Sequence, residues 1–95
     1  PWHPAVLELV ARAAQAGQHQ GKAVGVCGEA AADPLLALVL VGLGVTSLSM
    51  TWSAIDGVRA MLARHSSAEC SSLAAAALAG HDAEDARARV RTLVG

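Results

Sequence analysis

The chain has 95 residues, of which 54% are hydrophobic, 16% are charged and 2% are aromatic, and its formal net charge is −1. This length suits one domain, and the small charged fraction excludes an intrinsically disordered chain. Basic residues form no stripe and aromatic residues for base stacking are almost absent, so we expect no nucleic-acid binding. The mean hydropathy of +0.43 is high for so small a domain, which indicates that something else covers part of its apolar surface.

The cysteines and the longest apolar stretch indicate where in the cell the protein is expected and whether it spans a membrane. Cys27 and Cys70 show no spacing typical of a zinc site, and no secretory leader is recognisable, so we expect reduced thiols in a cytoplasmic protein. The apolar stretch over 34–45 contains Gly42 and Gly44 and is shorter than the about 20 residues that span a bilayer. We therefore expect no membrane span.

The residue pattern predicts helices and strands in the order α-β-α-β-α-α-α. Apolar residues at helical spacing alternate with two short runs rich in β-branched residues. Pro4 suits the first turn of a helix and Asp33 suits an N-cap. The buried stripe of the first helix is expected to comprise Val6, Leu9, Val10, Ala13 and Ala14. The expected elements are a helix over 4–17, a strand over 22–27, a helix over 34–43, a strand over 45–49, and helices over 54–64, 67–79 and 83–94.

Strands that alternate with helices predict an α/β chain with two short parallel strands and a mostly helical remainder. Both strands have the composition of strands that are buried on two faces, yet no other strand in the sequence could flank them. We therefore expect residues 1–95 to form a single partial domain. Each of the last three helices starts with a capping pair, namely Ser53 with Asp56, Ser66 with Glu69, and Asp82 with Asp85.

The triplet Cys27-Gly28-Glu29 directly follows the first predicted strand. Active sites of parallel α/β proteins lie at the carboxyl ends of the strands. A thiol there can act as a nucleophile or as a proton donor, Gly28 lets the backbone approach a ligand closely, and Glu29 can tune the thiol. Alternatively, Cys27 is a small buried apolar residue in a tight turn, as most free cysteines are.

Longer motifs carry a family resemblance. The segments His3-Pro4-Ala5-Val6-Leu7-Glu8-Leu9-Val10 and Gly25-Val26-Cys27-Gly28-Glu29-Ala30-Ala31-Ala32-Asp33-Pro34, with the pattern L-G-x-x-x-x-S-M over 43–50, resemble enzyme I of the bacterial sugar phosphotransferase system. The spacing between these blocks fits, and the resemblance covers essentially the whole chain. The Cys-Gly-Glu triplet alone also suits pyruvate phosphate dikinases and PEP synthases, whereas the pattern over 43–50 is closer to enzyme I.

The resemblance implies that the chain is the last quarter of a (β/α)8 TIM barrel that binds phosphoenolpyruvate (PEP) and Mg²⁺ and dimerises. By this analogy Cys27 donates a proton to C3 of the enolate that remains when PEP loses its phosphoryl group, and Gly28 and Glu29 shape the substrate pocket. The phosphoryl group passes to a protein histidine and then to the phosphocarrier protein HPr. The cationic clamps, the metal ligands and the phosphorylated histidine of the family lie outside this chain, so we expect the isolated chain to be inactive.

Other residues receive structural interpretations. Asp33 is expected to cap a helix rather than to bind a metal, and Thr51 is kept as a phosphate-contact candidate because loops after the last barrel strands often hold phosphate. Trp52 is assigned either to an interface or to the barrel rim. We expect surface or inert roles for His3, His19, His65, His81, Arg59, Arg64 and Cys70.

Two alternatives to the leading interpretation stay open. The chain could be the carboxy-terminal segment of a pyruvate phosphate dikinase or PEP synthase relative, which would use the same cysteine with another phosphoryl acceptor. It could also be a non-catalytic dimerisation or binding module that uses its exposed sheet edges.

Overall fold

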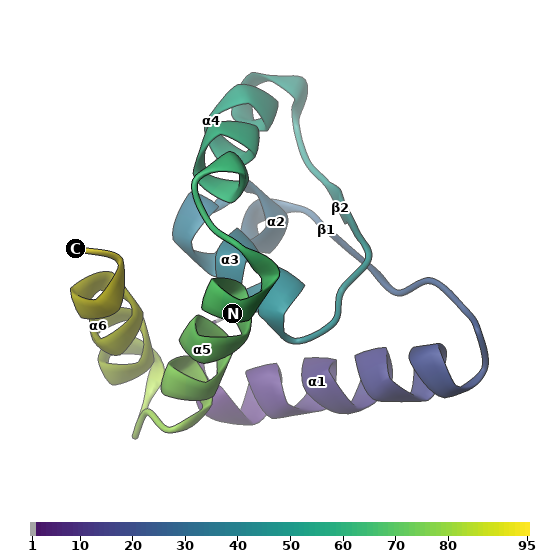
Figure 1. The fold of residues 1–95 in the computed structure, drawn as a ribbon, viewed down its shortest axis with the longest axis horizontal. Coiled ribbons are helices and arrows are strands. Elements are labelled where there is room, and N and C mark those ends of the chain that lie inside the picture. The colour runs from purple at the N-terminus through teal and green to yellow at the C-terminus, as the bar shows by residue number, and fades with distance from the viewer. Residues whose placement is uncertain (1) are drawn as a thin grey trace.

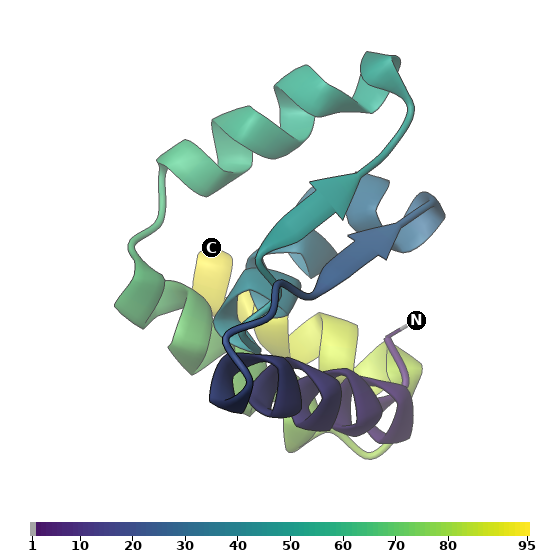
Figure 2. The same cartoon turned by 90° about the vertical axis from the view of Figure 1, so that its right-hand side faces the viewer.

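Two short parallel strands lie beside six helices in the computed structural model, which describes residues 2–95 (Figures 1 and 2). The two strands pair with each other over three residues each. The elements are α1 (Pro4–His19), β1 (Gly25–Cys27), α2 (Glu29–Ala32), α3 (Pro34–Gly42), β2 (Ser47–Ser49), α4 (Trp52–Ala63), α5 (Ser67–Leu78) and α6 (Ala83–Val94).

The sheet has one covered face and one open face. Val26 and Leu48 are half-buried and pack against the hydrophobic core, whereas their neighbours along both strands are exposed. The expectation that both strands are buried on two faces is therefore wrong for this chain. The physical reason is that its helices pack against only one side of the sheet, and a strand alternates its side chains between the two sides.

Helix α3 forms the centre of the core. Its side chains are apolar nearly all round, and Leu36, Leu38 and Val39 are almost completely buried. Gly42 lets α3 approach α5 closely, because a Cβ at this position would overlap the carbonyl oxygen of Cys70. Helix α6 adds Val90 to the same core, so the helical part of the molecule is tightly packed.

Side chains cap several helices. Asp33 accepts hydrogen bonds from the backbone N–H groups of Leu35 and Leu36 at the start of α3. Ser66 and Glu69 form a reciprocal capping box at the start of α5. The capping pattern at residues 53–56 is misleading, because α4 begins at Trp52, two residues before the expected start at residue 54, and no side chain caps it.

Several element bounds differ from the sequence-based expectation. Both strands are shorter than 22–27 and 45–49, because only the residues that face each other form the ladder. Helix α1 extends past residue 17 to His19. The segment between the expected strand over 22–27 and the expected helix over 34–43 contains the short helix α2, because three consecutive alanines have high helix propensity.

The buried face of α1 agrees with the expectation only in part: Ala14 is buried and Val10 packs against the core, but Val6 and Leu9 are exposed. Leu7 and Ala14 are buried, whereas Val6 is 44% exposed and Leu9 is 67% exposed. Positions 7 and 14 lie on one helical stripe and positions 6 and 9 lie on the next. The sequence offers both stripes, and only packing against α5 selects the first. An apolar strip of α1 is thus left uncovered.

Among residues 2–95, no helix is both long and apolar enough to cross a membrane.

Candidate active site at the carboxyl ends of the strands

Cys27 is the last residue of β1, and its side chain is exposed. The strand partner of Cys27 is Ser49, the last residue of β2. Just beyond the strand, the backbone N–H of Gly28 donates a hydrogen bond to the carbonyl oxygen of Ser49 at 3.0 Å. The thiol therefore stands at a fixed place where the two strands end, and the interpretation of Cys27 as a buried apolar residue in a turn does not apply.

Gly28 turns the chain sharply from β1 into α2. Its φ of 90° and ψ of −154° belong to a region that side-chain-bearing residues avoid. A Cβ at Gly28 would meet nothing within 4 Å, so the conformation and not crowding requires glycine. The space around the Gly28 backbone is open to an approaching ligand. Glu29 follows as an exposed residue in the first turn of α2.

The open face of the sheet carries only small side chains beside the thiol. Gly25 pairs with Ser47, and both are exposed on the same face as Cys27 and Ser49. A Cβ at Gly25 would lie 2.7 Å from the Ser47 hydroxyl oxygen, so this side chain leans over β1. The sequence placed Ser47 and Ser49 in a strand, but their pairing with Gly25 and Cys27 depends on the register, which a single sequence does not specify.

Asp33 has a structural role, because both of its carboxylate oxygens accept hydrogen bonds. One carboxylate oxygen accepts the two backbone N–H groups that begin α3, and the other accepts the indole N–H of Trp2 at 3.1 Å. The assignment of Asp33 as an N-cap is confirmed. The role of the buried Trp2 in holding this carboxylate was missed, because the two residues are distant in the sequence.

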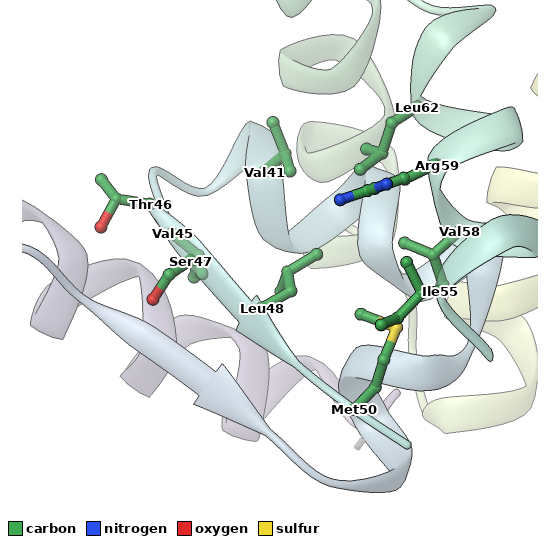
Figure 3. Close-up of a pocket in the computed structure, with 10 residues that line it drawn as sticks. All are labelled: Val41, Val45, Thr46, Ser47, Leu48, Met50, Ile55, Val58, Arg59 and Leu62. Carbon is green, nitrogen blue, oxygen red and sulfur yellow. The ribbon is translucent and has the colours of Figure 1, made fainter. Parts of the chain in front are cut away.

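Arg59 lines a groove of about 320 Å³ between α4 and β2 (Figure 3). Figure 3 shows its side chain pointing into this groove, among Val41, Leu48 and Leu62. Arg59 is exposed, as expected for a surface residue, and it also lines this groove against β2. Cys27 is not among the residues that line this groove.

Trp52 and Thr51 follow β2 directly. Trp52 is 85% exposed at the first position of α4. Thr51 is exposed, and its hydroxyl lies 3.4 Å from the hydroxyl of Ser53. Both residues are thus accessible beyond the carboxyl end of β2, while Cys27 is accessible at the carboxyl end of β1.

Two histidines have defined structural contacts. The Nδ1 atom of His3 accepts the backbone N–H of Ala5 and so caps α1. The side chain of His65 is only 13% exposed and lies 3.4 Å from the Glu69 carboxylate, so it is not a plain surface residue. The backbone N–H and the hydroxyl of Ser66 hold the pKa of Glu69 below its ordinary value, and His65 adds to this effect.

Cys70 differs from Cys27 in its surroundings. It is buried where α5 meets α3, and this burial raises the pKa of its thiol. A buried thiol with a raised pKa is a poor nucleophile. The expectation that Cys70 is inert agrees with its position.

The described part of the chain holds no cluster of three or more metal-ligating side chains. Near Cys27, Glu29 and Asp33 are the carboxylates of the adjoining α2 turn, and Asp33 already accepts three hydrogen bonds. The residues of this chain therefore do not fit a Mg²⁺ site by themselves.

Comparisons with known proteins agree on one family. Residues 1–67 match the family described as PEP-utilising enzyme, PEP-binding domain. The chain is 55% identical to the phosphoenolpyruvate-protein phosphotransferase of Streptomyces coelicolor over 99% of its length. It is 37% identical to the phosphoenolpyruvate-protein phosphotransferase of Latilactobacillus sakei over 77% of its length, and 42% identical to the multiphosphoryl transfer protein of Rhodobacter capsulatus over 90%.

The matched region is a small part of each relative. The alignments cover 17% of the S. coelicolor protein, 13% of the L. sakei protein and 10% of the R. capsulatus protein.

Proposed function

The chain belongs to the PEP-utilising enzymes, and from this premise we propose that it is the C-terminal part of a PEP-protein phosphotransferase. The full protein would transfer the phosphoryl group of PEP to a protein histidine during sugar uptake. The single observation that carries the proposal is the thiol of Cys27 at the carboxyl end of β1, exposed beside the open Gly28 turn. By itself the chain is proposed to be inactive.

We propose that residues 1–95 form a single partial domain, one quarter of a (β/α)8 barrel. The parallel pairing of β1 and β2, with helices on only one face, supports this architecture. The open face, with its small side chains, would then line the barrel interior. The uncovered apolar strip of α1 supports the proposal as well, since a larger barrel would supply neighbouring helices to cover it.

Cys27 would act as the proton donor. Transfer of the phosphoryl group from PEP breaks the bond between phosphorus and the enol oxygen and leaves the enolate of pyruvate. The S–H bond of Cys27 then breaks, a C–H bond forms at C3, and pyruvate and a thiolate result. Solvent returns a proton to the thiolate. This step is general acid catalysis, and an exposed thiol at the end of a strand can perform it.

The neighbours of Cys27 would shape the site. Gly28 leaves its backbone open to the substrate, and Glu29 would border the pocket from the start of α2. A metal such as Mg²⁺ would neutralise phosphate charge when bound, with ligands outside residues 1–95. The proposed partners are PEP and pyruvate, a phosphocarrier protein, and a second copy of the full protein.

A chimeric enzyme tests this function. The 95 residues replace the matched segment of the S. coelicolor phosphotransferase, and pyruvate formation is measured with PEP and the phosphocarrier protein. We expect the chimera to be active and Cys27→Ala to lower the rate about 100-fold or more, since general acid catalysis contributes that much. Cys70→Ala is the matched control, because it removes a buried thiol that has no proposed role.

The outcomes separate the alternatives. A chimera that keeps its rate after Cys27→Ala would contradict the proton-donor role. A well-folded chimera that forms no pyruvate would favour the non-catalytic module. If the 95 residues support pyruvate formation when they complete a pyruvate phosphate dikinase but not when they complete the phosphotransferase, the dikinase or PEP synthase alternative is favoured.

A further inference from the structure

We propose that Ser49 is a positioning residue for the Cys27 thiol, an inference that rests on the proposed function. Its hydroxyl would donate a hydrogen bond to the sulfur of Cys27. The sulfur would then present its S–H to a ligand above the open face, and the hydroxyl would stabilise the thiolate left after proton donation.

The strand register brings the two residues together. The two strands run parallel, side by side (Figure 2). Cys27 and Ser49 are direct partners in this ladder, and each is the last residue of its strand. Adjacent strands lie about 4.8 Å apart, and paired residues project their side chains from the same face. Both side chains are exposed on the open face, so no helix separates them.

The neighbouring pair shows how far a serine on β2 reaches. The hydroxyl oxygen of Ser47 lies 2.7 Å from the place where a Cβ of Gly25 would stand. Ser49 is two residues further along the same strand and lies on the same face of the sheet, but its partner is a cysteine. The hydroxyl of a serine on β2 can therefore lie over the partner position on β1.

The turn beyond the strands fixes this geometry. The hydrogen bond from the Gly28 N–H to the Ser49 carbonyl oxygen ties the backbone after Cys27 to Ser49 itself. The two strands consequently cannot shift their register, and so separate Cys27 from Ser49, without breaking this bond. A hydroxyl held beside a sulfur is a weak partner for a thiol and a stronger partner for a thiolate, because hydrogen bonds to charged groups are stronger.

Two isosteric substitutions in the chimera test the role of the hydroxyl. Ser49→Thr keeps it and Ser49→Val replaces it with a methyl group, while both side chains have the same shape and suit a strand. The first readout is the rate at which iodoacetamide labels Cys27 at pH 7, followed by mass spectrometry of the peptide that contains it. Ser47→Ala is the control on the same face, two residues away.

We expect Ser49→Val to slow labelling of Cys27 roughly threefold, since the thiolate is the reactive form and loses its donor. Ser49→Thr and Ser47→Ala should label within about twofold of the parent. In the pyruvate assay Ser49→Val should lower kcat roughly tenfold and leave KM for PEP unchanged, because the contact matters after binding.

Equal labelling rates in the Thr and Val variants would overturn the inference, whether or not the chimera is active. The proposed function would survive that result if Cys27→Ala still abolished activity. Conversely, an active Cys27→Ala chimera would refute the proton-donor role even if the labelling rates differ.

Discussion

The helical half of the molecule and the open face of its sheet are built in opposite ways. Helices α3, α5 and α6 bury large aliphatic side chains against one another, whereas the open face of the sheet carries glycine, serine and cysteine residues that are exposed to solvent. The first region is packed against other parts of the same chain. The second holds Cys27, the proposed proton donor, and no other part of residues 2–95 covers it. The packed core and the proposed chemistry thus lie in different regions of one short chain.

The largest expected effect lies in the helical half. Leu38→Ala removes a side chain with no exposed surface from the middle of α3 and should lower the free energy of unfolding by about 3 kcal/mol. Leu9→Ala, at an exposed position of α1, should cost less than about 0.5 kcal/mol. Urea unfolding of the 95-residue chain measures both. Similar costs for the two variants would show that the contrast between packed and uncovered regions is wrong.

The close approach of α3 and α5 gives the next effect. Gly42→Ala should cost about 2 kcal/mol, because the new Cβ would overlap the Cys70 carbonyl and push the helices apart. Gly57→Ala in α4 is the matched control: its Cβ would enter open space, so stability should rise by about 0.5 kcal/mol. The same urea titration tests both, and a neutral Gly42→Ala would mean that the two helices are not closely packed.

A smaller effect is expected where the sheet ends. Gly28→Ala forces a side chain into a backbone region that only glycine adopts easily and should cost about 1 to 2 kcal/mol. Gly95→Ala, also at positive φ but at the end of the chain, should be nearly neutral because the terminus can relax. Thermal unfolding followed by circular dichroism compares them. If Gly28→Ala also leaves the thermal stability unchanged, the turn after Cys27 does not keep the positive φ that the structure gives Gly28.

The smallest effect is a pH dependence carried by surface carboxylates of the helical half. The Ser66 N–H lowers the pKa of Glu69, and the His81 N–H together with Arg89 lowers the pKa of Asp85. Depressed pKa values stabilise the fold above the ordinary values of 4.5 and 3.8, and this stability is lost as pH falls below them. The Tm should therefore decrease as the pH is lowered below about 4.5.

Removing one of these carboxylates should weaken that dependence. In Glu69→Ala the decrease of Tm between pH 6 and pH 3 should be smaller than in the parent chain. Ser71→Ala, at an exposed position of α5 that carries no titratable group, should leave the decrease unchanged. If Tm decreases equally in the Glu69→Ala variant and in the parent, the capping box does not lower the pKa of Glu69.

Local features of the fold could be predicted from the sequence. The capping box at Ser66 and Glu69 and the cap at Asp33 depend on residues two or three positions apart, and both are present. Cys27 at the end of a strand also follows from a local pattern. The start of α4 is an exception, because a competing capping pattern one residue beyond Trp52 is not used.

Features that depend on distant residues could not be predicted in this way. The pairing of Cys27 with Ser49 requires the strand register, and the buried face of α1 requires contact with α5. The bond from Trp2 to Asp33 likewise joins two separate segments. The candidate site was therefore found from its cysteine, while the side chain next to that cysteine became visible only in three dimensions.

The two tryptophans give the molecule a pair of optical reporters, one for each region. Trp2 is 7% exposed and bonded to Asp33 in the packed half, whereas Trp52 is 85% exposed just past the strand ends. Emission from the first should be blue-shifted and shielded from acrylamide, and emission from the second should be red-shifted and readily quenched. A molecule that settles over the strand ends would change the second signal and leave the first as an internal reference.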